Sequence, residues 1–211
     1  VKKNNYLCRI IKKSFYENKC YNRGCKYICG IDEVGRGPLA GPVVAAAVIL
    51  KKDSYFEGLN DSKKLSEKKR EELYDKITNE AIAYAICEVN NEEIEKYNIY
   101  NAARIAMQRA VEKLDVKPDF LLIDAMPFEN YPIPNFSMVK GDEKSVSIAA
   151  ASVIAKVYRD NLMKKYASKY PYYDFENNAG YGTKKHLEGL RKHGITPIHR
   201  RDFEPIKSMI K

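Results

Sequence analysis

The most constraining feature of this sequence is a short, wholly apolar segment, Phe-Leu-Leu-Ile at residues 120–123. A strand with one face in water alternates apolar and polar residues, whereas a strand covered on both faces is apolar throughout. Residues 120–123 therefore predict a central strand with structure packed on either side. Asp124 follows directly, so a carboxylate stands where this strand ends.

The rest of the pattern supplies the layers that such a strand needs. Residues 27–32, 43–50 and 81–89 predict strands, the second from its β-branched and small residues and the third from its alternating character. Strands first, then helices that alternate with further strands, favour an α/β fold with a mixed sheet.

Helical segments lie between and after these strands. Ser66 can N-cap a helix that has Leu73 and Ile77 on one face. Residues 91–114 predict a long helical stretch that breaks near Asn98, and residues 145–166 predict a helix whose many small residues permit a close approach to a sheet. The remainder predicts short helices and loops with Gly and Pro.

The hydrophobic content is sufficient for one sizeable core, at 45% of 211 residues. The longest apolar run, residues 38–50, contains two prolines and a glycine, and it is shorter than the roughly 20 residues of a membrane span. The first 29 residues lack the apolar stretch of a secretory signal. We therefore expect no membrane segment and a cytoplasmic location.

Charge is unevenly distributed along the chain. Residues 1–29 carry a net +7, residues 30–155 a net −5 and residues 156–211 a net +7. Basic ends around an acidic middle favour a protein that holds a polyanion with its flanks and performs cation-dependent chemistry at its centre. Alternatively, the lysines and arginines only solubilise the protein surface.

The cysteines and histidines predict no transition-metal site. An odd number of cysteines without an export signal indicates free thiols, and their irregular spacing lacks a C-x-x-C pair. The histidines lack the i, i+4 spacing of a metal-binding helix, so we expect them on the surface or at phosphates. These residues are Cys8, Cys20, Cys25, Cys29, Cys87, His186, His193 and His199.

Four carboxylates stand where an apolar segment gives way to a loop or a helix start: Asp32, Glu33, Asp124 and Asp142. A buried carboxylate is costly unless something compensates its charge, and a divalent cation is the simplest compensation for several of them. Oxygen ligands favour Mg²⁺ or Mn²⁺, and the chemistry that follows is two-metal phosphodiester hydrolysis. Taken singly, each acid could instead be a turn residue or a helix cap.

Asp32 and Glu33 are adjacent, and adjacent residues of a regular strand point to opposite faces. We therefore expect the chain to leave the strand there, helped by Gly35, Arg36 and Gly37. The glycines permit positive φ and leave backbone amides free to approach a ligand. A turn without function is the alternative. Tyr181, between two glycines in a basic stretch, could stack on a base or sugar.

Together these motifs resemble bacterial ribonuclease HII, the type 2 ribonuclease H. The resemblance covers residues 26–211 and is carried in order by the segments 30–48, 59–66, 122–124, 139–142, 147–157, 159–160, 180–183 with His186, and 199–203. It implies a ribonuclease H-like fold, a central mixed five-stranded sheet flanked by helices with a helical C-terminal region. We accordingly divide the chain into a basic N-terminal extension, residues 1–25, and a catalytic domain, residues 26–211.

The resemblance also implies roles for single residues. Asp32, Glu33, Asp124 and Asp142 match the family's metal-binding carboxylates. Gly35, Arg36 and Gly37 match the element that recognises the ribose 2′-hydroxyl at an RNA-to-DNA junction, largely through backbone groups. Tyr181 matches the tyrosine that stacks on the deoxyribose on the 3′ side. Asn60 and Lys63 resemble residues near the substrate phosphate.

The implied activity is that of an endonuclease dependent on Mg²⁺ or Mn²⁺. It would cut the RNA strand of RNA/DNA hybrids, and it would cut 5′ of single ribonucleotides in duplex DNA, leaving a 3′-hydroxyl and a 5′-phosphate. We expect a monomer, and the sequence is silent on contact with a sliding clamp. Two rival hypotheses are a hybrid-binding protein without catalysis and a related metal nuclease, such as a junction resolvase, that does not require the 2′-hydroxyl.

Overall fold

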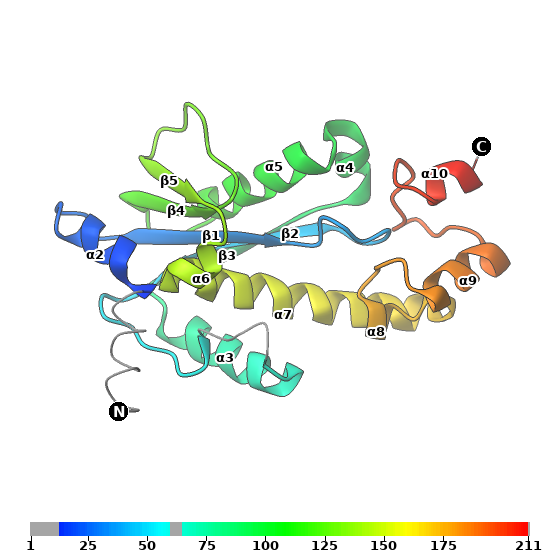
Figure 1. Cartoon of the computed structure of the whole chain (residues 1–211), viewed down its shortest axis with the longest axis horizontal. Coiled ribbons are helices and arrows are strands. Elements are labelled where there is room, and N and C mark those ends of the chain that lie inside the picture. Colours follow the sequence, from blue (N-terminus) through cyan, green and yellow to red (C-terminus); the bar gives the residue numbers. More distant parts are fainter. Residues whose placement is uncertain (1–12, 60–64, 211) are drawn as a thin grey trace.

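The computed structural model describes residues 13–59 and 65–210, which form a mixed five-stranded sheet between two helical layers (Figure 1). The strands are β1 (Ile28–Val34), β2 (Val43–Ile49), β3 (Ala83–Val89), β4 (Phe120–Asp124) and β5 (Asn135–Met138). The helices are α2 (Phe15–Tyr21), α3 (Glu67–Glu80), α4 (Asn91–Tyr97), α5 (Ile99–Glu112), α6 (Gly141–Lys144), α7 (Val146–Lys169), α8 (Phe175–Asn178), α9 (Lys184–His193) and α10 (Ile206–Met209), with a 3₁₀ turn η2 (Pro171–Tyr173).

The strand order is β3-β2-β1-β4-β5. β1 and β2 pair antiparallel, as do β2 and β3, whereas β4 runs parallel to both β1 and β5. The expected α/β architecture is confirmed, and the apolar segment at residues 120–123 forms an interior strand. β5 was not predicted from the pattern because it is only four residues long, with Asn135 and Ser137 half-buried at the sheet edge.

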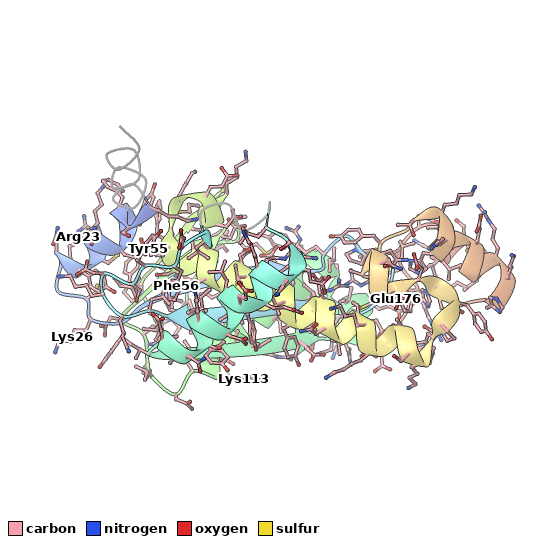
Figure 2. All side chains as sticks on the ribbon, turned by 90° about the horizontal axis from the view of Figure 1, so that it is seen from below. Arg23, Lys26, Tyr55, Phe56, Lys113 and Glu176 are labelled. Carbon is pink, nitrogen blue, oxygen red and sulfur yellow. The ribbon has the colours of Figure 1, made fainter. Side chains whose placement is uncertain are left out.

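Both faces of the sheet are buried. Along β2, Ala45 and Ala47 pack into a core with α5, while Ala46 and Val48 pack into a core with α3 and α7. In Figure 2, which views the molecule from this side, α3 lies in front of α7. The helix predictions are confirmed: Ser66 caps α3, and Asn98, at φ 63°, separates α4 from α5.

The close approach of α7 to the sheet is confirmed at Gly30. A Cβ atom on Gly30 would overlap the backbone of Ser147 in the first turn of α7. Small residues on α7, among them Ala149 and Ala150, are fully buried. A glycine in β1 and alanines on the helix thus set the start of α7 directly against the central strand.

The start of the described chain is packed onto the domain. In α2, Cys20 contributes to a small core with Ile28, Leu122 and Met138. The buried carboxylate of Glu17 accepts hydrogen bonds from Ser145 Oγ (2.5 Å) and Ser147 N (3.0 Å). Part of the proposed basic extension is therefore in contact with the N-terminus of α7.

The C-terminal helices α8, α9 and α10 gather around the C-terminal part of α7, where the connection between β1 and β2 reaches them (Figure 1). Leu39 and Ala40 of that connection pack with Met163, Phe175 and Leu190.

Free thiols are found on the described cysteines, Cys20, Cys25, Cys29 and Cys87. Among the described residues, no helix combines the length and apolar character needed to cross a bilayer.

Candidate active site

Three of the predicted carboxylates meet where β1 and β4 end. These strands are parallel neighbours whose register pairs Ile31 with Ile123, so the next residues, Asp32 and Asp124, lie at the same edge of the sheet. Glu33 follows on β1. One carboxylate oxygen from each of these three acids lies within 4.8 Å of the others.

The expectation that the chain leaves the strand at Asp32 was wrong. β1 continues to Val34, and its pairing with β2 matches Asp32 with Ala46 and Glu33 with Ala45. On the other side, the described pairing with β4 stops at Ile31. The end of β1 therefore has a free edge beside Asp124, and the long side chain of Glu33 reaches the cluster from a regular strand.

Asp142 lies in α6 and lines the same cleft, whose volume is about 310 Å³. It does not belong to the described group of three acids with oxygens within 4.8 Å. Gly141 connects α6 to the cluster, because its backbone N–H donates to Asp124 Oδ1 at 2.5 Å. This bond places the residue before Asp142 directly against the cluster.

Burial and mutual repulsion disfavour charge on the clustered acids. Burial raises the pKa of Asp32 well above its usual range, and the carboxylates of Glu33 and Asp124 add to the effect. Burial also raises the pKa of Glu33 to about 7, although the Arg36 guanidinium acts in the opposite direction. Three acids that repel one another in a partly dry cleft are a favourable setting for a cation.

The cluster fits a hard divalent ion. All its donors are carboxylate oxygens, the ligands preferred by Mg²⁺ and Mn²⁺. Oε2 of Glu33 is buried and has no hydrogen-bond partner among the described residues. A buried polar atom without a partner calls for a specific explanation, and a cation between these carboxylates supplies one.

The loop after β1 lies beside this cluster. Gly35 adopts φ 92°, as its residue type permits. The Arg36 side chain reaches back to Glu33, with Nη1 at 3.7 Å from Oε1. On the other side, a Cβ atom on Gly37 would lie 3.3 Å from the ring of Tyr181, which is 48% exposed. The carboxylates, the glycine loop and Tyr181 therefore form one continuous surface.

The sequence model of ribonuclease HII matches residues 29–206, most of the chain and all of this site's described residues. The chain belongs to the ribonuclease HII family. Ribonuclease HII of Macrococcus caseolyticus (strain JCSC5402) is 62% identical over 186 residues, which are 88% of this chain and 70% of that protein. The protein of Enterococcus faecalis (strain ATCC 700802 / V583) is 58% identical over 197 residues, 93% of this chain and 77% of that protein.

Solved structures agree on the fold. The ribonuclease H2 of Pyrococcus horikoshii OT3 matches with a TM-score of 0.74 at 24% identity, over 87% of this chain and 96% of that chain. Bst-RNase HIII in complex with Mn²⁺ matches with a TM-score of 0.69 at 18% identity, over 90% of this chain and 71% of that chain. The predicted ribonuclease H-like fold is confirmed. Ribonucleases HII are metal-dependent endoribonucleases that cleave the RNA of RNA/DNA hybrids.

Two of the predicted site residues, Asn60 and Lys63, lie outside the described residues. Conversely, the ribonuclease HII cleft contains Arg70, Ser152 and Lys156, which sequence reasoning did not assign to it. Ser152 and Lys156 are four residues apart on α7 and so share a face, but that spacing is also common on purely structural helices. Arg70 comes from α3, and no local pattern links α3 to the carboxylates.

The expectation that all three histidines lie on the surface or at phosphates was wrong for His186 and His199. Both are buried, and their Nε2 atoms lie 3.0 Å apart. The N–H of Thr196 donates to His199 Nδ1 at 2.8 Å, and His186 Nδ1 lies 2.9 Å from the carbonyl oxygen of Tyr181. They form a neutral pair beneath the Tyr181 turn because the C-terminal helices cover them.

Proposed function

We propose that this ribonuclease HII, besides cleaving RNA in hybrids, incises duplex DNA on the 5′ side of single ribonucleotides and leaves 3′-hydroxyl and 5′-phosphate ends. One observation carries the proposal. The carboxylate cluster and the glycine loop are joined through the contact of Arg36 with Glu33. In our proposal this loop senses the sugar, directly beside the groups suited to hydrolysis.

In this proposal Asp32, Glu33 and Asp124 hold divalent metal, and Asp142, which lines the same cleft, completes the set. When bound, Mg²⁺ or Mn²⁺ ions supply an activated water and neutralise charge on the leaving oxygen, in a two-metal arrangement. Lys156 and Arg70 line the same cleft and provide positive charge for the scissile phosphate.

Selectivity is assigned to the loop and to Tyr181. The 2′-hydroxyl is the local chemical difference between a ribonucleotide and DNA, so an enzyme that tells them apart must contact it. Gly35, Arg36 and Gly37 offer backbone groups for this contact. The exposed ring of Tyr181 offers a surface on which the neighbouring deoxyribose packs. All these groups come from one chain, so a monomer is sufficient.

The decisive test compares two duplexes that differ by one oxygen atom. One contains a single ribonucleotide in DNA and the other is its all-DNA twin, and each is incubated with and without Mg²⁺. We expect incision only of the first duplex, only with metal, with the ribonucleotide at the 5′ end of the product. Equal incision of both duplexes would instead indicate a resolvase-type nuclease, and binding without incision would indicate a hybrid-binding protein.

A further inference from the structure

Two buried arginines lie beneath the glycine loop. Arg159, on α7, and Arg200, after α9, are 1% and 0% exposed. Among the described residues, both guanidinium groups donate hydrogen bonds to backbone carbonyl oxygens and to no carboxylate. Six carbonyls are held in this way: Gly35, Arg36, Ala40, Gly41, Pro42 and Ala179.

Arg200 holds the loop itself. Its Nη2 donates to the carbonyl of Gly35 at 2.5 Å, its Nη1 to the carbonyl of Arg36 at 2.8 Å and its Nε to the carbonyl of Gly41 at 3.0 Å. Only a guanidinium presents donors spread widely enough to reach three separate carbonyls from one buried position. The loop between β1 and β2 is thus fixed at both its beginning and its end.

Arg159 fills the space under the same loop. A Cβ atom on Gly35 would overlap the Arg159 side chain, so glycine is needed there for packing as well as for its positive φ. Arg159 also donates to the carbonyls of Ala40 (3.1 Å) and Ala179 (2.8 Å). Since Ala179 lies two residues before Tyr181, Arg159 connects the glycine loop to the turn that carries the exposed tyrosine.

Because the peptide group is planar, holding its carbonyl oxygen also fixes the direction of its N–H group. In a trans peptide the C=O of one residue and the N–H of the next point in opposite directions. Arg200 binds the carbonyls of Gly35 and Arg36 from the buried side, so the N–H groups of Arg36 and Gly37 point to the exposed side. Among the described residues, neither N–H has an acceptor.

We infer that Arg200 is a positioning residue for ribose recognition: it holds two peptide planes so that the N–H groups of Arg36 and Gly37 are ready to meet the 2′-hydroxyl. The inference rests on the proposed function and deepens it. Burial and the charge of Arg159 lower the pKa of Arg200 to about 9, so Arg200 is still charged at neutral pH. The two buried positive charges also favour an electron-rich oxygen above the loop.

The first test measures discrimination in binding. Dissociation constants for the duplex with one ribonucleotide and for its all-DNA twin are measured with Ca²⁺ in place of Mg²⁺, so that neither strand is cut. We compare the wild type with Arg200→Lys, which keeps a charge but not the spread of donors. The dissociation constant of the all-DNA duplex divided by that of the ribonucleotide duplex should fall about five- to tenfold in the variant, the range expected from losing a hydrogen bond to the hydroxyl. The dissociation constant of the all-DNA duplex itself should change by no more than about twofold.

A matched control separates positioning from stability. Met107→Ala opens a cavity in the core around α5, where Met107 is fully buried, and should lower the melting temperature without changing the ratio. An unchanged ratio in folded Arg200→Lys would overturn the inference while leaving the proposed function intact. A wild type that binds both duplexes equally would overturn both.

A second measurement needs no variant and no substrate. Nitrogen-15 relaxation of the free wild-type chain should give order parameters of about 0.85 for the N–H groups of Arg36 and Gly37, the value of rigid backbone. Values below about 0.6 would mean that the arginine does not hold these peptide planes, and they would overturn the inference even if Arg200→Lys did not fold.

Discussion

Burial makes ionisation of the cleft carboxylates unfavourable, and a bound cation offsets this free-energy cost. Asp32 is 6% exposed, and Oε2 of Glu33 has no partner among the described residues. Such groups are poor stabilisers of the metal-free fold. Their placement is therefore better explained by ligand binding than by stability.

Replacing Asp32 or Asp124 by Asn should lower the rate of hydrolysis by several orders of magnitude. The amide keeps an oxygen that can accept the bonds now donated by Glu33 N and Gly141 N, but it loses the charge needed to bind metal. Duplex binding should survive, as measured by fluorescence anisotropy. Glu143→Gln, an exposed acid beside Asp142, is the control and should remain active; retained activity in either Asn variant would refute the metal assignment.

In the metal-free protein, ionisation of Glu33 should contribute a loss of stability as the pH rises. The pKa of Glu33 is raised from 4.5 to about 7, so the folded state holds a proton that the unfolded state has lost between these values. The stabilisation is complete below about pH 4.5 and disappears as the pH passes 7, with a total of about 3 kcal/mol. Denaturant unfolding in EDTA should show this loss in the wild type but not in Glu33→Gln.

Adding Mn²⁺ should reverse the effect at pH 8, where Glu33 is ionised and can bind the ion. A wild type and a Glu33→Gln variant with parallel pH profiles would contradict the shifted pKa.

Helix α2 ties the N-terminal segment to the catalytic layers. Glu17 accepts hydrogen bonds from Ser145 and Ser147 at the N-terminus of the 24-residue helix α7, where a negative charge also interacts favourably with the helix dipole. The division of the chain at residue 25 stays a prediction. A deletion at that boundary would remove a contact of α7 together with the basic charges.

Two deletions of different length should separate these contributions. Residues 1–12 carry four Lys or Arg and no acid, so their removal should flatten the dependence of binding on salt through lost counterion release. Removal of residues 1–25 should also destabilise the fold. The slope of log Kd against log salt and the melting temperature are measured for both.

Glu17→Ala in the full chain is the control for the longer deletion. It leaves the donors of Ser145 and Ser147 without their acceptor and should cost about 1–3 kcal/mol of unfolding free energy, with no change in the salt slope. An unchanged slope after removal of residues 1–12 would refute the proposed role of these charges.

The C-terminal helices and the sheet respond to acid in opposite ways. His186 and His199 form a chain of hydrogen bonds that requires both rings to be neutral: Thr196 N–H donates to His199 Nδ1, His199 Nε2 donates to His186 Nε2, and His186 Nδ1 donates to Tyr181 O. Burial lowers the pKa of His199 to about 4, and repulsion between the two rings when both are protonated adds to the effect. Protonation of His199 at Nδ1 would lose the bond from Thr196 N–H, and protonation of His186 at Nε2 would lose the bond between the two rings.

The contribution of His199 to stability should therefore be lost as the pH falls from about 6.5 to about 4, opposite in sign to the contribution of Glu33. In this range the unfolded histidine binds a proton that the folded one excludes, with a limit of about 3 kcal/mol for His199. His199→Gln, which cannot gain charge, should have a flatter melting profile between pH 7 and pH 5. An equally steep profile in this variant would show that another group is responsible.

Local pattern was sufficient for most elements. Sequence neighbours determine helix capping and the periodicity of apolar residues. This is why the sequence predicts the unbroken apolar run of β4, the cap at Ser66 and the break at Asn98. The identity of the clustered carboxylates could likewise be predicted, because each one ends an apolar segment.

Tertiary packing decided the rest. Arg200 meets Gly35 across 165 residues, and Glu17 meets Ser145 across 128 residues; no periodic signal connects such positions. Nor could the pattern indicate that β1 would run on past Asp32, or that His186 and His199 would be covered. A short stretch of sequence contains the side-chain types and the periodicity of its apolar residues. The distance between residues far apart in the chain, and the burial of each side chain, depend on which elements pack together in three dimensions.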